Sequence, residues 1–114
     1  MKVIGKIILR MEKYIYERKD GYVFSGYWKN NLMNGEGFLR INGEIIYEGD
    51  WINNKRNGYG ISFENSKKAY NGTWENDKRH GSGIYYKDGI KVYEGQWAND
   101  KRHGSGIYYC GTKE

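Results

Sequence analysis

The sequence predicts an all-β fold, a single-layer elongated antiparallel sheet of stacked β-hairpins. Three observations support this prediction. Tryptophan, glycine and tyrosine recur together at one constant step along the chain. Each period contains two short alternating segments separated by a polar turn, which is the pattern of a hairpin. The 114 residues include 17 glycines but no proline, so the glycines occupy defined strand positions instead of flexible loops.

The tryptophans define the repeat, because the step from each one to the next is the same. They are Trp28, Trp51, Trp74 and Trp97. Glycine keeps this step two positions before each tryptophan, at Gly26, Gly49, Gly72 and Gly95. Later Gly-x-Gly pairs also keep it, at Gly35 and Gly37, Gly58 and Gly60, Gly81 and Gly83, and Gly104 and Gly106. The array therefore has four units, at about 24–46, 47–69, 70–92 and 93–111.

The last unit illustrates the expected hairpin. Its first strand, 93–97, reads Tyr-Glu-Gly-Gln-Trp, so alternation places Tyr93, Gly95 and Trp97 on one face. A polar segment at 99–104 supplies the Asn, Asp and Gly that favour a reversal, and the second strand follows it. A second turn, Lys87-Asp88-Gly89, joins one hairpin to the next. We expect the four indoles to form the core, each lying over the bare backbone of a Gly-x-Gly pair.

The pattern Tyr-x-Gly-x-Trp, followed at a fixed distance by Gly-x-Gly, resembles the MORN repeat. The resemblance covers about 24–109 and is weakest in the first unit, where Phe24 replaces tyrosine and Leu32-Met33 lies in the turn. It implies a MORN-repeat domain at 23–114, preceded by an N-terminal cap or degenerate repeat at 1–22. Such repeats serve as scaffolds and dimerisation elements in cytoskeletal, ciliary and membrane-junction proteins, and have been credited with phospholipid binding.

The N-terminal segment Lys2–Lys13 leaves two interpretations open. Its apolar residues recur at helical spacing between lysines and arginines, which is typical of a basic amphipathic helix at a membrane surface or in a mitochondrial presequence. Gly5 and Glu12 do not favour that interpretation. We therefore favour a short helix or strand that caps the first repeat, since the ends of solenoids need covering.

The aromatic residues beside the tryptophans are the candidate partner-binding residues. We expect them to line a shallow groove for a helix or extended peptide, because tyrosine supplies large contact area at low entropic cost. They are Phe24, Tyr47, Tyr70, Tyr86, Tyr93 and Tyr109. The leading hypothesis is thus a non-catalytic scaffold module that docks a partner protein on the aromatic face, as a subunit of a larger assembly.

Cations also recur with the repeat, and stacking would gather them into a basic ridge at the turns. They are Lys55, Arg56, Lys78, Arg79, Lys101 and Arg102. The net charge of +5 is compatible with an acidic partner. The alternative function is therefore peripheral membrane attachment through acidic phospholipids, while the simpler interpretation is a solvated edge that keeps foreign strands away.

The sequence does not favour an enzyme, a cofactor or a metal site. The two histidines, His80 and His103, occupy equivalent repeat positions without a second ligand at metal-binding spacing. Cys110 is the only cysteine, so no intrachain disulfide can form, which fits an intracellular protein, cytoplasmic, cytoskeletal or membrane-peripheral. Nucleic acid is a less favoured partner than protein or lipid. Its binding needs cations and stacking aromatics on one surface, whereas here the cations lie in turns and the aromatics in strands. Exposed end strands permit self-association.

Overall fold

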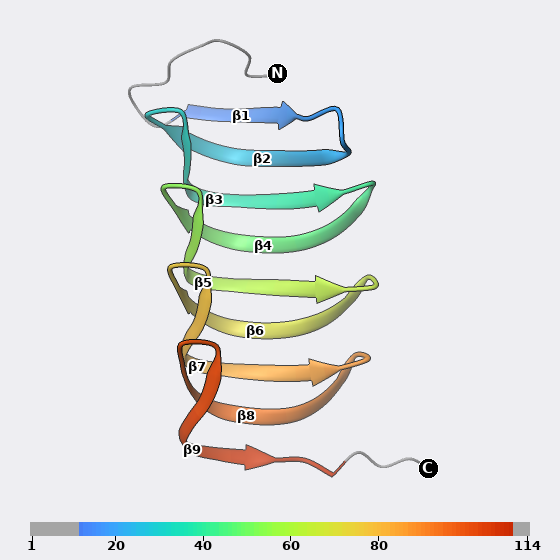
Figure 1. The fold of residues 1–114 in the computed structure, drawn as a ribbon, viewed down its shortest axis with the longest axis vertical. Helices are drawn as coiled ribbons and strands as arrows, with labels where there is room; N and C mark the ends of the chain where they lie inside the picture. Colours follow the sequence, from blue (N-terminus) through green and yellow to red (C-terminus); the bar gives the residue numbers. More distant parts are fainter. Residues whose placement is uncertain (1–11, 111–114) are drawn as a thin grey trace.

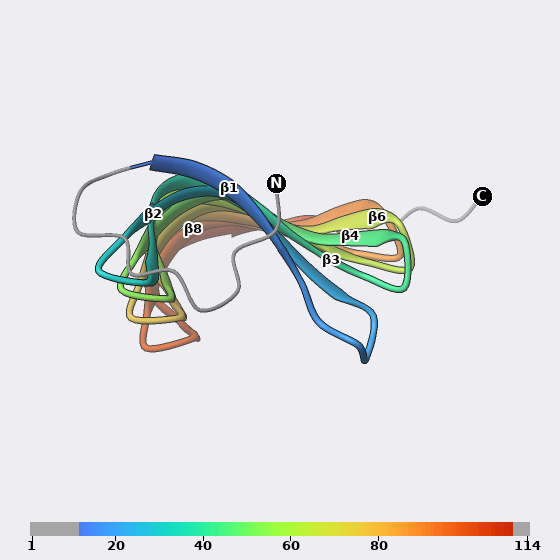
Figure 2. The same cartoon turned by 90° about the horizontal axis from the view of Figure 1, so that it is seen from above.

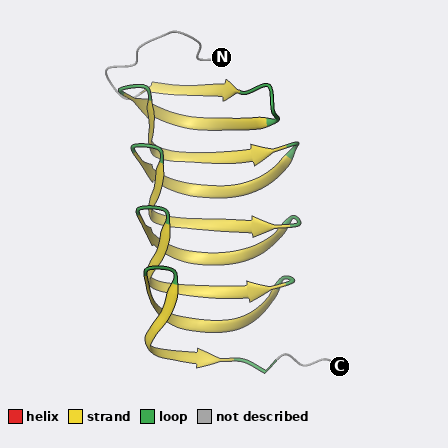
Figure 3. Cartoon of the chain, viewed as in Figure 1, coloured by secondary structure: helices red, strands yellow, loops and turns green. Residues whose placement is uncertain are grey.

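The computed structural model describes residues 12–110, which form one open sheet of nine antiparallel strands in sequence order (Figure 1). The strands are β1 Glu12–Glu17, β2 Tyr22–Lys29, β3 Leu32–Ile41, β4 Glu44–Ile52, β5 Lys55–Glu64, β6 Lys67–Glu75, β7 Lys78–Lys87, β8 Ile90–Ala98 and β9 Lys101–Tyr108. The described residues contain no helix (Figure 3). The predicted all-β sheet of stacked hairpins is confirmed, with principal extents of 50 × 28 × 17 Å.

The N-terminal segment can be judged only from Glu12 onward, because residues 1–11 lie outside the described part. Strand β1 pairs with β2 in register from Glu12 opposite Trp28 to Glu17 opposite Val23. The last two residues of the segment, Glu12 and Lys13, therefore lie in a strand, which is one of the two forms expected for the cap.

Two-residue turns join the strands from β2 to β9 at both edges of the sheet, while four residues, 18–21, connect β1 to β2. At one edge they are Asn30-Asn31, Asn53-Asn54, Asn76-Asp77 and Asn99-Asp100, which we call the Asx tips. At the other edge they are Asn42-Gly43, Asn65-Ser66 and Asp88-Gly89. Both residues of every one of these turns have positive φ, a conformation that Asn, Asp and Gly adopt most readily and that matches the twist of paired strands. The turn predicted at Asp88-Gly89 is confirmed.

A ladder of glycines crosses the middle of the sheet. Pairs of glycine face one another across every strand boundary from β2 to β9, through Gly26, Gly37, Gly49, Gly60, Gly72, Gly83, Gly95 and Gly106. A Cβ at Gly49 would overlap the Cα of Gly60, so the strands run past each other with no side chain between them. This bare strip leaves room for aromatic rings on one face of the sheet.

The rings over the glycine ladder are tyrosines, and the prediction that indoles would lie there is wrong. A Cβ at Gly60 would overlap the ring and hydroxyl of Tyr47, and Gly83 and Gly106 lie in the same way under Tyr70 and Tyr93. The tryptophans instead face the first glycine of each pair, as Trp74 faces Gly58. On the other side of each tryptophan-bearing strand the register shifts, as between Gly49 and Trp51, and this bulge places Trp51 opposite Arg56.

Tyrosine and tryptophan alternate along the stack to form the core. The ring of Tyr70 contacts Trp74 of its own unit and Trp97 of the next, edge-on, at centroid distances of 5.0 and 5.4 Å. Each indole nitrogen donates to a backbone oxygen of the preceding unit, as Trp74 does to Gly60 at 3.1 Å. All four tryptophans are buried, as predicted. Figure 2 shows the Asx tips bending away from the plane of the sheet, all to one side.

Candidate functional site

Three of the six candidate partner-binding aromatics are core residues, so the expectation that they line an accessible groove is wrong for them. Tyr47, Tyr70 and Tyr93 are each 1% exposed. The hydroxyl of each donates to a nearby backbone oxygen of its own strand, as Tyr47 does to Asp50 at 3.1 Å. These side chains have neither free surface nor a free donor for a partner.

Burial also changes the acid–base behaviour of these tyrosines. Burial raises the pKa of Tyr70 to about 12, against which the nearby Arg79 acts weakly. Burial and the Asp50 carboxylate raise the pKa of Tyr47 further. Both rings therefore stay neutral over the physiological range, as core residues should.

The other three candidates lie in different places. Phe24 is half-buried and packs against the aromatic core. Tyr86 is half-buried near the end of β7, and Tyr109 follows β9, 38% exposed. The hydroxyl of Tyr109 donates to Glu94 at 3.1 Å, and Lys91 lies over its ring. The six residues do not form one surface.

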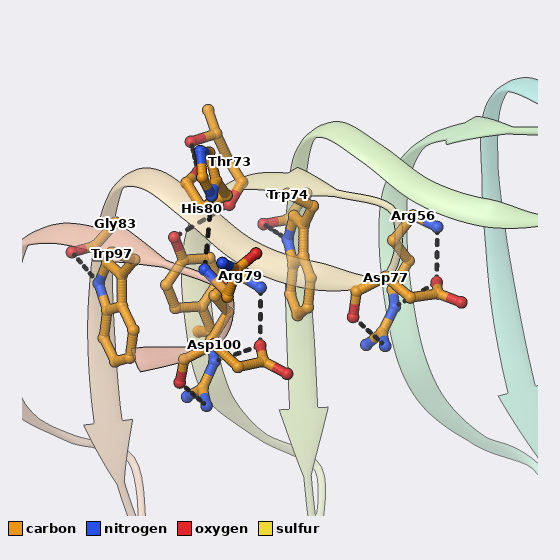
Figure 4. Close-up of polar contacts among 12 residues, drawn as sticks. Arg56, Thr73, Trp74, Asp77, Arg79, His80, Gly83, Trp97 and Asp100 are labelled. Atoms are coloured by element: carbon orange, nitrogen blue, oxygen red, sulfur yellow. Dashed lines mark hydrogen bonds and ion pairs between the residues drawn. The ribbon is translucent and has the colours of Figure 1, made fainter. Parts of the chain in front are cut away.

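The predicted basic ridge is divided by the fold. Its six cations occupy the first two positions of β5, β7 and β9 and not the turns themselves. The lysines of this set, Lys55, Lys78 and Lys101, are exposed. Two of the arginines are held by aspartates of the next unit, Arg56 by Asp77 and Arg79 by Asp100 (Figure 4).

Histidine has a structural role in the third unit. The ring of His80 lies between Glu75, 3.3 Å from its Nε2, and the amide of Asn99, which donates to its Nδ1 at 3.4 Å. The hydroxyl of Thr73 donates to the His80 carbonyl (Figure 4). Residues 12–110 contain no cluster of three or more potential metal ligands. They also contain no helix long and apolar enough to cross a membrane.

The face opposite the aromatic core, which we call the second face, carries an apolar ladder that crosses all nine strands. Its members occupy the odd-numbered strands: Ile15, Phe38, Ile61, Ile84 and Ile107. Polar residues alternate with them in continuous register on the even-numbered strands: Ser25, Glu48, Asn71 and Glu94. Adjacent strands lie about 4.8 Å apart, so apolar members recur about every 10 Å.

This ladder was not predicted from the sequence, although a periodic pattern in the sequence indicates it. Its five apolar members follow one another at the same constant step as the tryptophans. Ile15 and Ile107, at the two ends, are 39% and 58% exposed, while the three between them are half-buried.

The second face is hollowed over β1 to β5. A shallow groove of about 660 Å³ lies there, with Phe38, Tyr59 and Ile61 in its lining. Three carboxylates share that lining, those of Glu36, Glu48 and Asp50. The Asp50 carboxylate accepts the Tyr59 amide at 3.3 Å, and none of the three has an ion pair with residues 12–110.

The two cations in the lining, Arg40 and Lys13, form no ion pair with those carboxylates among residues 12–110. The guanidinium of Arg40 lies 4.7 Å from the centre of the Phe38 ring, and the ammonium of Lys13 lies 5.8 Å from that of Tyr27. The groove therefore combines aromatic and aliphatic surface with unpaired negative charge.

Comparison with known families agrees with the repeat geometry. A family model for the MORN repeat matches residues 24–43, 47–65, 70–91 and 93–113, which is more than half of the chain. No curated protein matches the chain. MORN repeats are in general modules for interaction with proteins or membranes and are not catalytic. The four matches fall on the four predicted units, so the chain belongs to the MORN-repeat family.

Proposed function

We propose that this chain is a non-catalytic interaction module that docks an amphipathic helix of a partner protein along its second face. The observation that carries the proposal is the apolar ladder, whose five members lie on alternate strands across the whole sheet, opposite the face that holds the buried aromatic core. A helix advances about 10.5 Å in seven residues, at about 1.5 Å per residue. Apolar side chains at every seventh helical position would therefore meet successive ladder members about 10 Å apart.

The carboxylates that line the groove predict that the partner helix carries positive charge. Glu36, Glu48 and Asp50 line the groove with Phe38 and Ile61 and have no ion pair among residues 12–110, so a helix that flanks its apolar stripe with lysine or arginine would complement them. Charge complementarity of this kind selects partners and speeds association more than it adds affinity. The partner is accordingly a basic amphipathic helix in a scaffolded assembly.

The test is selection of helical peptides from a display library, followed by affinity measurements on folded variants. The selected peptides should carry heptad-spaced apolar residues with flanking basic residues. Ile61→Asp should weaken their binding by about tenfold or more, as expected when a central apolar contact is lost. Ile90→Asp is the matched control, because Ile90 is an exposed isoleucine outside the ladder, 56% exposed. Equal losses in both variants, or unchanged binding in both, would contradict the proposal.

Membrane attachment is a second candidate, supported by the exposed row of Lys55, Lys78 and Lys101. Each such lysine is worth about 1 kcal/mol near an anionic bilayer. The engagement of Arg56 and Arg79 by aspartates reduces the charge available. Cosedimentation with phosphatidylserine vesicles separates the two candidates: lysine-dependent, salt-sensitive binding unaffected by Ile61→Asp would favour the membrane.

A further inference from the structure

Arginine and aspartate form the same clamp at two successive unit boundaries. The Arg56 amide donates to Asp77 Oδ1 at 2.8 Å and its Nε to the same oxygen at 3.1 Å. Arg56 Nη2 donates to the Asp77 carbonyl at 2.9 Å, and the Asp77 amide donates back to the Arg56 carbonyl at 2.9 Å. Arg79 and Asp100 repeat all four contacts, at 2.7 to 3.1 Å (Figure 4).

A third arginine in the series, Arg102, has no such aspartate. It faces Trp97 in the register, as Arg56 faces Trp51 and Arg79 faces Trp74. Residues 12–110 place no carboxylate in an ion pair with Arg102, and every residue of β9 is exposed. At β9 the arginine of the clamp is thus present, but residues 12–110 supply no aspartate to pair with it.

Aromatic rings hold the Arg102 guanidinium in place without a carboxylate. It lies 5.6 Å from the ring centre of Tyr85, and 5.2 Å from those of Tyr93 and Tyr108. Contact with these rings limits the conformations of the side chain, which lowers the entropic cost of binding an anion. The guanidinium is therefore preorganised for a carboxylate.

We propose that the edge of β9, which no strand among residues 12–110 covers, binds an acidic extended segment of a partner protein, whose aspartate closes the clamp on Arg102. The backbone edge favours an added strand, which would pair with β9 as β8 pairs with β7. Charge favours an acidic segment, because β9 begins Lys101-Arg102-His103 and contains no acidic residue. A second copy of this chain is a poorer occupant, since Asp77 and Asp100 are already engaged. The proposal concerns a different surface from the docked helix.

The chain supplies its own probe for the test. A fluorescent peptide with the sequence of residues 70–77, Tyr-Asn-Gly-Thr-Trp-Glu-Asn-Asp, contains the strand and aspartate that close the clamp on Arg56. Fluorescence anisotropy with the 114-residue chain should give about tenfold tighter binding for this peptide than for the same peptide with Asn at its last position, because hydrogen bonds to a charged group are lost.

Two variants of the chain complete the design. Arg102→Gln should abolish the difference between the two peptides. Lys101→Gln removes the same charge from the neighbouring residue and should preserve that difference. Equal binding of both peptides to the unmodified chain, or equal loss in both variants, would overturn the proposal. So would dimerisation in sedimentation that Arg102→Gln abolishes, because β9 would then bind a second copy. Ile61→Asp should leave peptide binding intact, which keeps this test independent of the helix-docking proposal.

Discussion

Replacement of Gly60 by alanine tests which ring lies over the glycine ladder. A Cβ at position 60 would overlap the Tyr47 ring, and overpacking of a core typically costs about 1–3 kcal/mol. Replacing glycine by alanine also restricts the unfolded chain, and this entropic effect stabilises the fold by about 0.4–1 kcal/mol. Gly60 does not have positive φ, so no backbone strain adds to the cost. The expected net loss of unfolding free energy is about 1–2 kcal/mol, or a fall in Tm of roughly 5–15 °C.

A double-mutant cycle assigns that loss to Tyr47. Urea unfolding is measured for the unmodified chain, Gly60→Ala, Tyr47→Phe and the double variant. Removal of the hydroxyl relieves the closest part of the overlap, so the alanine penalty should shrink by about 0.5 kcal/mol or more in the phenylalanine background. Additive penalties, or a Gly60→Ala chain as stable as the original, would refute the placement of the tyrosine ring over the glycine.

Three further predictions concern the core and the clamps. Trp74→Phe should lower the unfolding free energy by about 1–3 kcal/mol in urea unfolding, because it leaves the buried Gly60 carbonyl without its indole donor. Asp77→Ala should cost about 1 kcal/mol more than Asp88→Ala, which shares its positive φ but closes no clamp; equal thermal shifts would argue against the clamp. Alkali should destabilise the fold as pH rises from about 10, the ordinary pKa of tyrosine, to about 12, the raised pKa of Tyr70, because only the unfolded chain ionises readily there. The difference in tyrosinate absorbance between the unmodified chain and Tyr70→Phe isolates Tyr70 from the other tyrosines. This difference should appear together with the loss of circular dichroism, and its appearance near pH 10 in a chain that is still folded would contradict the prediction.

The repeat, the hairpins and the buried indoles could be predicted because they depend on local signals. A constant step between tryptophans, alternating strands and turns such as Asp88-Gly89 are read directly from the order of residues. The ring over each glycine could not be predicted in this way. Tyr47, Gly49 and Trp51 share one face by alternation, so the pattern does not say which of the two rings lies over Gly60, and it gives no sign of the register shift that places Trp51 opposite Arg56.

The clamps were missed because their two partners lie far apart in the sequence, in different units. In the sequence, Asp77 stands beside Lys78 and far from Arg56, so the order of residues gives no sign of its partner. In the fold, its carboxylate instead reaches Arg56 across the unit boundary. The consequence was an overestimate of the free cations in the ridge.

The closed core face explains why the candidate docking surface lies opposite the tyrosines. Packing against the tryptophans and over the glycine ladder leaves Tyr47, Tyr70 and Tyr93 only 1% exposed in a sheet with one layer, while the Asx tips bend to one side of that sheet (Figure 2). The residues that stabilise the stack are thereby separated from the second face, where Ile61 and Glu48 face each other without any role in that core. We therefore expect substitutions on the second face to cost less stability than substitutions of the core tyrosines and tryptophans. A repeat built in this way keeps a spacing of about 10 Å on its free surface whatever side chains that surface carries.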